Sequence, residues 1–335
     1  MSGPPLAVTL GDPAGIGPEI VAAAWSALRA TGPSFFAVGD AATIAAAGCA
    51  ISRVVEPKEA PVAFTDALPV LDLPLEAAVT PGRPTSGAAL QVIAWIERAV
   101  ALALSGEAAG VVTAPIAKAT LYDAGFAYPG HTEFIGALTA KAAMPGTRGP
   151  VMMLTGQDLR VALVTVHAPL AQVPGLLTQA KIVATGHVVA EALRRDFGVD
   201  RPRLVVAGLN PHAGEGGAIG DEEIRIVAPA VAALRAAGLD VRGPLPADSL
   251  FHDAARQTYD AALCLYHDQA LIPVKMLDFW GGVNLTLGLP IVRTSPDHGT
   301  AFDIAGKGLA RPDSLIAAIR LAHEIAERRA ALVAA

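Results

Sequence analysis

The chain has 335 residues, of which 53% are hydrophobic and 17% charged, a balance that excludes a disordered protein. The net charge of −6 comes with no basic stripe, so neither nucleic acid nor an anionic membrane is expected as a partner. The sequence holds no apolar run of about 18 residues free of charges or breakers, and no start typical of a signal peptide. Its two cysteines, Cys49 and Cys264, are far apart and form no disulfide framework. We therefore expect a globular cytoplasmic protein of one large α/β unit or two domains.

Short apolar runs alternate along the chain with longer, Ala-rich helical stretches. This alternation predicts a largely parallel sheet covered by helices on both faces. In chain order, strands are expected at 6–12, 35–40, 109–117, 151–156, 159–169, 203–212 and 261–268, and helices at 18–30, 87–104, 181–198, 222–238 and 314–335. Two stretches, 53–83 and 125–149, have weak patterns, and either could hold a domain crossing.

Three histidines follow predicted strands at equivalent places. His167, His212 and His267 each come directly after an apolar strand pattern. Open α/β sheets bind ligands beyond the carboxyl ends of their strands, so the three imidazoles could converge there. Three neutral nitrogens suit a Zn²⁺-like divalent ion with a fourth position open, as in a catalytic site. The alternative for each is a hydrogen-bonded loop histidine.

Further polar segments interrupt the apolar pattern. The glycine-rich run 210–223 could let backbone N–H groups approach an anion, or it could be a flexible loop. Residues 113–118 lead into a helical pattern that begins at His131 and Thr132, and the Thr132 hydroxyl could cap that helix or contact a phosphate. The run 275–308 carries Lys275, Asn284 and Arg293, and an arginine is suited to forked phosphate recognition.

The N-terminal sequence GDPAGIGPE, residues 11–19, lies between a predicted strand and a predicted helix. Its spacing matches neither the dinucleotide fingerprint nor the P-loop. It is interpreted as a structural turn or as lining of a substrate cleft.

Taken together, these motifs closely resemble those of the 4-hydroxythreonine-4-phosphate dehydrogenases of pyridoxal phosphate biosynthesis. The matching pieces occur in the family's order from residue 11 to residue 308: GDPAGIGPE, TAPIAK, GHTEF, LNPHAGEGG, GPLPAD, YHDQ, GVNLTLGLP and RTSPDHGTAFDIAGKG. The resemblance implies a two-domain fold like that of isocitrate and isopropylmalate dehydrogenases, with a mostly parallel sheet, rather than a Rossmann fold. We expect a cofactor-side domain at 1–128 with 293–335, and a metal, substrate and dimerisation domain at 129–292.

The resemblance also implies roles for individual residues. The divalent-metal ligands, for Zn, Mg or Co, fall on the three histidines His167, His212 and His267. The implied contacts with the substrate fall on His131, Thr132, Lys275, Asn284 and Arg293. Lys275 and Asp248 are the candidates for catalysis, Lys275 by handling a proton or holding a charged group of the substrate. The cofactor-binding candidates, in a loop similar to the adenosine loop of isopropylmalate dehydrogenases, are Gly299, Thr300, Ala301 and Asp303.

The implied reaction is NAD-dependent oxidation of 4-phosphooxy-L-threonine to a β-keto acid that loses CO₂ and gives 3-amino-2-oxopropyl phosphate. The carboxylate of Asp303 favours NAD over NADP, although NADP remains an alternative. The resemblance further implies a homodimer whose active site is completed by the second subunit. The alternatives are a sister group that oxidises D-threonate or D-erythronate 4-phosphate, a metal-dependent phosphatase, a phosphate acyltransferase, and a metal-binding protein without catalysis.

Overall fold

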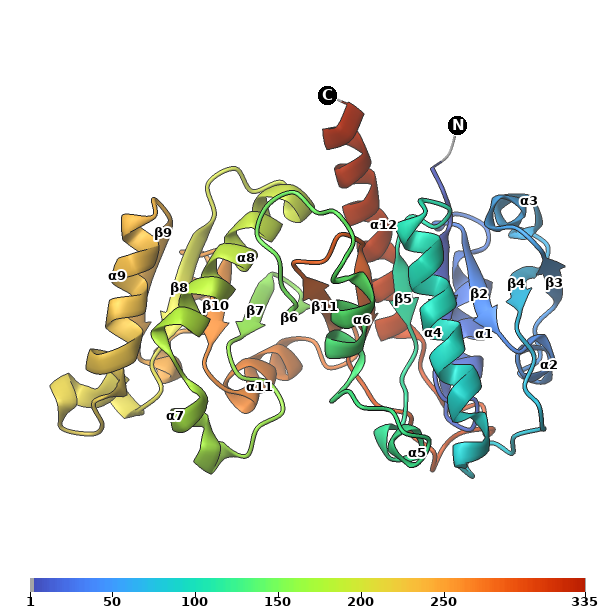
Figure 1. Ribbon diagram of the computed structural model, residues 1–335, viewed down its shortest axis with the longest axis horizontal. Helices are drawn as coiled ribbons and strands as arrows, with labels where there is room; N and C mark the ends of the chain where they lie inside the picture. The colour runs from blue at the N-terminus through green and yellow to red at the C-terminus, as the bar shows by residue number, and fades with distance from the viewer. Residues whose placement is uncertain (1–2, 335) are drawn as a thin grey trace. The chain divides into compact units, whose positions relative to one another are not determined.

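The computed structural model describes residues 3–334. Three residues lie outside this description. They are residues 1 and 2, where no signal peptide is expected, and residue 335, which ends the predicted last helix and domain. The chain forms two compact units, one of Met1–Ala143 with Leu289–Ala330 and one of Met144–Gly288 with Ala331–Ala335. The predicted α/β class with a mostly parallel sheet is confirmed, and Figure 1 shows strands and helices in both units.

The paired strands within the sheet of the first unit all run parallel to each other. Its strand order is β3-β4-β2-β1-β5-β12. The strands of this unit are β1 (Leu6–Thr9), β2 (Phe35–Gly39), β3 (Ile51–Val54), β4 (Leu68–Asp72), β5 (Val111–Thr113) and β12 (Arg293–Pro296). The helices are α1 (Gly17–Leu28), α2 (Ala41–Ala46), α3 (Ala60–Ala63), α4 (Ala89–Leu104), α5 (Lys118–Asp123), α6 (His131–Thr139) and α12 (Asp313–Ala334), whose last residues belong to the second unit.

Helix α4 packs on β1, β2 and β5 of this unit, across the sheet as Figure 1 shows. The residues buried along it, Val92, Trp95, Ile96, Ala99 and Val100, repeat with helical spacing. The Trp95 indole also donates a 2.9 Å hydrogen bond to the Leu73 carbonyl. By length and hydropathy alone, Ser86–Leu104 could cross a membrane. Its buried stripe instead makes it a core helix of the first unit.

The second unit has a mixed sheet in the order β11-β6-β7-β10-β8-β9. Strands β7, β10, β8 and β9 are parallel, whereas β6 runs antiparallel to both β7 and β11. The strands are β6 (Val151–Gly156), β7 (Leu159–Leu163), β8 (Arg203–Ala207), β9 (Asp240–Leu245), β10 (Ala261–Cys264) and β11 (Val283–Leu287). The helices are α7 (Val173–Leu176), α8 (Gln179–Phe197), α9 (Ala228–Ala236), α10 (Asp253–Arg256) and α11 (His267–Leu277).

The boundaries of the two units differ from those expected from the sequence. The N-terminal segment of the first unit ends at Ala143, where 128 was expected. Its C-terminal segment begins at Leu289, where 293 was expected. Helix α6 packs against α4, which ties it to the first unit. His131 and Thr132 consequently lie in the same unit as Arg293.

Candidate active site

The three candidate metal histidines follow three parallel strands of the second unit. His167 comes four residues after β7, His212 five residues after β8, and His267 opens α11 after β10. Strand β10 pairs in parallel with both β7 and β8. Because parallel strands end at a common edge, the backbone brings all three histidines to the same edge of this sheet.

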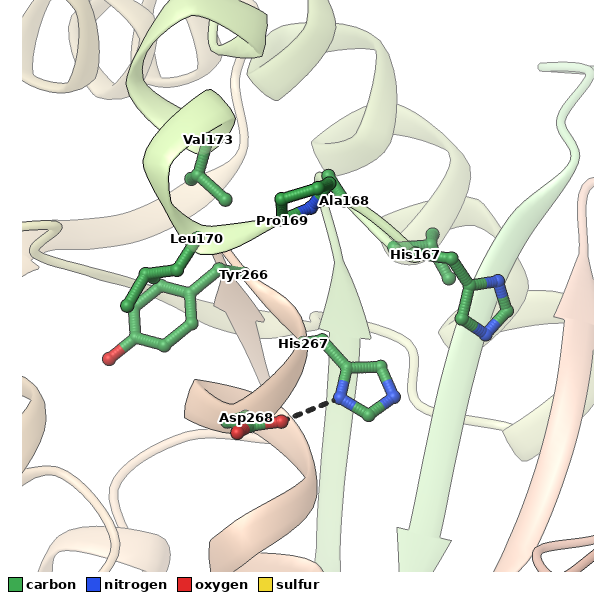
Figure 2. A pocket seen from close by; sticks show the side chains of 9 residues that line it. His167, Ala168, Pro169, Leu170, Val173, Tyr266, His267 and Asp268 are labelled. Carbon is green, nitrogen blue, oxygen red and sulfur yellow. Dashed lines mark hydrogen bonds and ion pairs between the residues drawn. The ribbon is translucent and has the colours of Figure 1, made fainter.

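His167 and His267 lie side by side and line a pocket of about 400 Å³. Their ring centroids are 5.8 Å apart, and Figure 2 shows the two rings beside each other. Two imidazoles bound to one tetrahedral ion have centroids about 5 Å apart, since each Zn–N bond is about 2.0–2.1 Å. The spacing of this pair is somewhat wider than that value, so the fold places the two rings near each other without forming a complete metal site in the described part of the chain.

The Asp268 carboxylate fixes the orientation of the second histidine. It lies 2.7 Å from His267 Nδ1, as the dashed line in Figure 2 marks. A carboxylate at one ring nitrogen keeps the proton there and leaves the lone pair of the other nitrogen for a metal. The His267 Nε2 atom is thus the available donor.

His212 does not join this pair. It begins a run of left-handed backbone, with φ of 51° at His212, 51° at Ala213 and 45° at Glu215. The start of the loop is held by Glu223, whose carboxylate accepts 2.7 Å hydrogen bonds from the backbone N–H groups of Leu209 and Asn210. Within residues 3–334, no group of three or more His, Cys, Asp or Glu side chains is arranged to hold a metal ion. A single chain thus brings together two of the three predicted donors.

A buried polar cluster occupies the first unit around Arg293. This arginine opens β12, is 3% exposed, and donates a 2.7 Å hydrogen bond to the Thr113 hydroxyl at the end of β5. Burial lowers the pKa of Arg293 to about 10, and the Glu133 carboxylate opposes that shift. A guanidinium with this pKa remains charged at neutral pH.

His131 belongs to the same cluster. Its Nε2 atom is buried and has no hydrogen-bond partner among residues 3–334. Burial, and after it the positive charges of Arg293 and Lys118, hold the pKa of His131 well below its usual range. The imidazole is therefore neutral at physiological pH and offers one ring nitrogen to a ligand.

Lys118 and Glu133 complete the cluster, and the site prediction from the sequence did not include them. A Cβ placed on Gly130 would lie 3.5 Å from Glu133 Oε2 and 3.7 Å from Lys118 Nζ, so both charged ends reach the N-terminus of α6. The N-cap, Gly130, makes no side-chain capping bond. Two cations face one anion at an uncapped helix end, an arrangement that favours binding of an anion.

The remaining substrate and catalytic candidates lie in the second unit. Asn284 sits on β11 opposite Leu154, and its Oδ1 atom is buried without a hydrogen-bond partner in the described part of the chain. The Lys275 ammonium lies 5.4 Å from the centre of the Phe279 ring. Asp248 is exposed in a short helical turn and does not line the pocket of His167 and His267.

The four cofactor candidates form one exposed loop after β12 in the first unit. Gly299 and Asp303 are exposed, and Ala301 has the left-handed φ of 43°. The Thr300 carbonyl accepts a 2.9 Å hydrogen bond from the Ile16 N–H group in the turn before α1. The loop is thus anchored to the turn before α1 on one side, and Gly299 and Asp303 are exposed to solvent.

The comparisons with known proteins agree along nearly the whole chain. Residues 33–322 match the family described as the pyridoxal phosphate biosynthetic protein PdxA. A 4-hydroxythreonine-4-phosphate dehydrogenase from Caulobacter vibrioides is 63% identical over 98% of this chain and 99% of its own length. The crystal structure of the enzyme of the same name from Klebsiella pneumoniae is similar with a TM-score of 0.85 and 44% identity, covering 97% of this chain and 98% of that one. A terephthalate 1,2-cis-dihydrodiol dehydrogenase from Burkholderia xenovorans follows at a TM-score of 0.64 and 30% identity, over 96% of this chain and 98% of its own.

Proposed function

Since the chain belongs to the PdxA family of pyridoxal phosphate biosynthesis and is an oxidoreductase of its 4-hydroxythreonine-4-phosphate dehydrogenase type, we propose that it oxidises 4-phosphooxy-L-threonine with NAD. The C3 hydroxyl loses a proton, C3 gives a hydride to NAD, and the product is 2-amino-3-oxo-4-phosphooxybutanoate. This β-keto acid loses CO₂ because the ketone accepts the electrons, which leaves 3-amino-2-oxopropyl phosphate. The observation that carries the proposal is the pair His167 and His267, whose ring centroids lie 5.8 Å apart beside a pocket.

The proposed metal ligands are His167, His267 and His212. A divalent ion, zinc, magnesium or cobalt, would supply Lewis-acid polarisation at the alcohol oxygen that is oxidised. Asp268 holds the His267 ring so that Nε2 faces away from the carboxylate. The histidines thus have the donor chemistry that the ion needs, with two of the three already adjacent.

The polar cluster of the first unit is proposed to bind the phosphate of the substrate. Arg293 and Lys118 supply positive charge, the uncapped start of α6 supplies backbone N–H groups, and His131 offers a neutral ring nitrogen. Thr132 in the first turn of α6 adds a hydroxyl. Asn284 and Lys275 would hold the other polar groups, and Lys275 is the candidate that moves the proton. Asp248, exposed outside the histidine pocket, stays a weaker candidate for that role.

We further propose a homodimer in which a second copy completes the site. Four exposed apolar side chains, Ile272, Met276, Phe279 and Trp280, form a stripe on α11 and the turn after it, on the helix that also carries His267 and Lys275. Their exposed fractions range from 51% to 81%. A site shared between two copies would account for a third donor, His212, that lies apart from the other two within one chain.

The choice of substrate is tested by following NADH absorbance with 4-phosphooxy-L-threonine, D-threonate 4-phosphate and D-erythronate 4-phosphate in parallel. We expect the amino acid to have the highest kcat/KM. A preference for either sugar acid would move the chain to the sister specificity and keep the site map. Release of inorganic phosphate without NADH would instead identify a phosphatase and contradict the proposal.

A further inference from the structure

The turn before α1, residues 11–16, packs against the loop 299–306 that follows β12. The Ile16 N–H group donates a 2.9 Å hydrogen bond to the Thr300 carbonyl. A Cβ on Gly15 would lie 2.8 Å from that same carbonyl oxygen and 3.0 Å from Thr300 Cβ. Glycine at position 15 is therefore what allows the loop to approach the turn.

Glu19, in the first turn of α1, holds the far end of the same loop. Its Oε1 atom accepts a hydrogen bond from the Gly306 N–H group. Its Oε2 atom is buried and has no hydrogen-bond partner among residues 3–334. A buried carboxylate oxygen without a partner is costly, so an acid at this position needs a compensating use.

A third contact supports the loop from the segment before α4. The Gly82 N–H group donates a 2.7 Å hydrogen bond to the Ala14 carbonyl. A Cβ on Gly82 would lie 3.0 Å from the Phe302 carbonyl oxygen. The turn, α1 and this segment thus surround the buried side of the loop.

The backbone of the loop shows that these supports are needed. Ala301 has a φ of 43°, a conformation that residues with a Cβ rarely adopt and that persists only where the surroundings fix it. The strained residue lies between the anchors at Thr300 and Gly306, and the exposed Asp303 lies between the same two points. The hydrogen bonds at Thr300 and Gly306 therefore help to fix the strained segment between them.

We infer that Glu19 is a positioning residue for an adenine dinucleotide. It holds the loop 299–306 in the conformation that presents Asp303 and the backbone of 299–301 to this ligand. The inference rests on the proposed use of NAD. It also gives the motif GDPAGIGPE a purpose: Gly15 seats one end of the loop and Glu19 ties the other.

The test is isothermal titration calorimetry of NAD with the full-length protein and its variants. Glu19→Ala removes the acceptor, and we expect NAD to bind about tenfold more weakly, as the loss of one charge-assisted hydrogen bond implies. Glu19→Gln keeps the accepting oxygen and should bind within about threefold of the wild type. The matched control is Glu97→Ala, on the exposed face of α4 in the same unit.

Steady-state kinetics give the second measurement. KM for NAD should rise in Glu19→Ala, while KM for 4-phosphooxy-L-threonine and the melting temperature stay near those of Glu97→Ala. If Glu19→Ala does not fold, Gly15→Ala tests the other anchor against Gly3→Ala, a glycine with nothing within 4 Å of its Cβ position.

Each outcome decides a different claim. Equal NAD affinity in Glu19→Ala and Glu97→Ala would overturn the inference and leave the proposed function intact. A parallel fall in NAD affinity, substrate affinity and stability would show a purely structural role and also overturn it. Wild-type protein that binds neither NAD nor NADP would overturn the proposed cofactor and the inference together.

Discussion

The polar cluster around Arg293 is complete within one chain, whereas the histidine pocket contains only part of its expected metal site. Arg293 is 3% exposed and tied to Thr113, and its cluster of cations and helix N-terminus lies entirely in the first unit. The His267 side chain is 37% exposed, and the pocket has two of its three predicted donors. A buried charge must be partnered by the fold that buries it, whereas a metal site can be left for the ion or a second chain to complete. The first region is therefore preorganised, and the second depends on what binds there.

The largest effect is expected in the histidine pocket. His167→Ala or His267→Ala should lower kcat by about 10³-fold or more, because a lost metal ligand removes several kcal/mol of charge stabilisation. The fold should survive, since both side chains line a pocket rather than the core. His323→Ala, which removes an exposed pair with Glu327 on α12, is the control. Near-normal turnover in either variant would remove the pair from the mechanism.

A smaller effect is expected from the carboxylate behind the pair. Asp268→Asn should weaken metal affinity by about 10–100-fold, because it no longer fixes the proton on His267 Nδ1. Metal titration with and without competing chelator measures the change. Asp253→Asn, an almost fully exposed acid on α10, serves as control, and equal affinities in the two variants would contradict the orienting role.

A substitution in the polar cluster should weaken substrate binding, seen in KM, more than it slows the chemical step, seen in kcat. Lys118→Met should raise KM for the phosphorylated substrate by about tenfold with a smaller change in kcat, since it removes one of two cations at the start of α6. The same variant should lose inhibition by inorganic phosphate. Lys141→Met removes an exposed charge beyond α6 and controls for net charge. If both variants behave alike, Lys118 does not contact the anion.

The smallest effect concerns stability and pH. His131 has a depressed pKa in the folded chain, so below about pH 6.5 the unfolded chain takes up a proton that the folded chain refuses. Stability should therefore be fully present above pH 6.5 and fall as pH drops, by at most about 1.4 kcal/mol per pH unit from this residue. Thermal melts of wild type and His131→Gln between pH 7 and 5 measure it. Parallel curves for the two proteins would show that His131 is not the source.

Sequence pattern predicted the elements that are uniformly apolar and missed those that polar or proline residues interrupt. Strands β1, β2, β5, β6, β7, β8 and β10 and helices α1, α4, α8, α9 and α12 confirm the predicted alternation. Strand β4 lies in the stretch 53–83 and contains Pro69, so its local pattern is weak. It forms because β2 and β3 pair on either side of it. Pairing of this kind is a long-range property that no local window contains.

The candidate site was predictable where a topological rule applies. Because ligands gather at the carboxyl ends of parallel strands, the three histidines could be chosen from the sequence, and the parallel pairing of β7, β10 and β8 confirms their common edge. The adjacency of His167 and His267, and the left-handed loop that carries His212, depend on packing. The same holds for Lys118 and Glu133, whose charged ends both come near Gly130 because Lys118, at the start of α5, lies close to the start of α6.

The most direct test of the account is NADH formation from 4-phosphooxy-L-threonine before and after chelation and on return of a divalent metal. We expect NADH formation by the metal-loaded protein, loss of activity with chelator, and recovery with zinc, magnesium or cobalt. The His167→Ala variant should stay inactive throughout. Full activity in the presence of chelator would contradict a metal-dependent dehydrogenase built on His167 and His267.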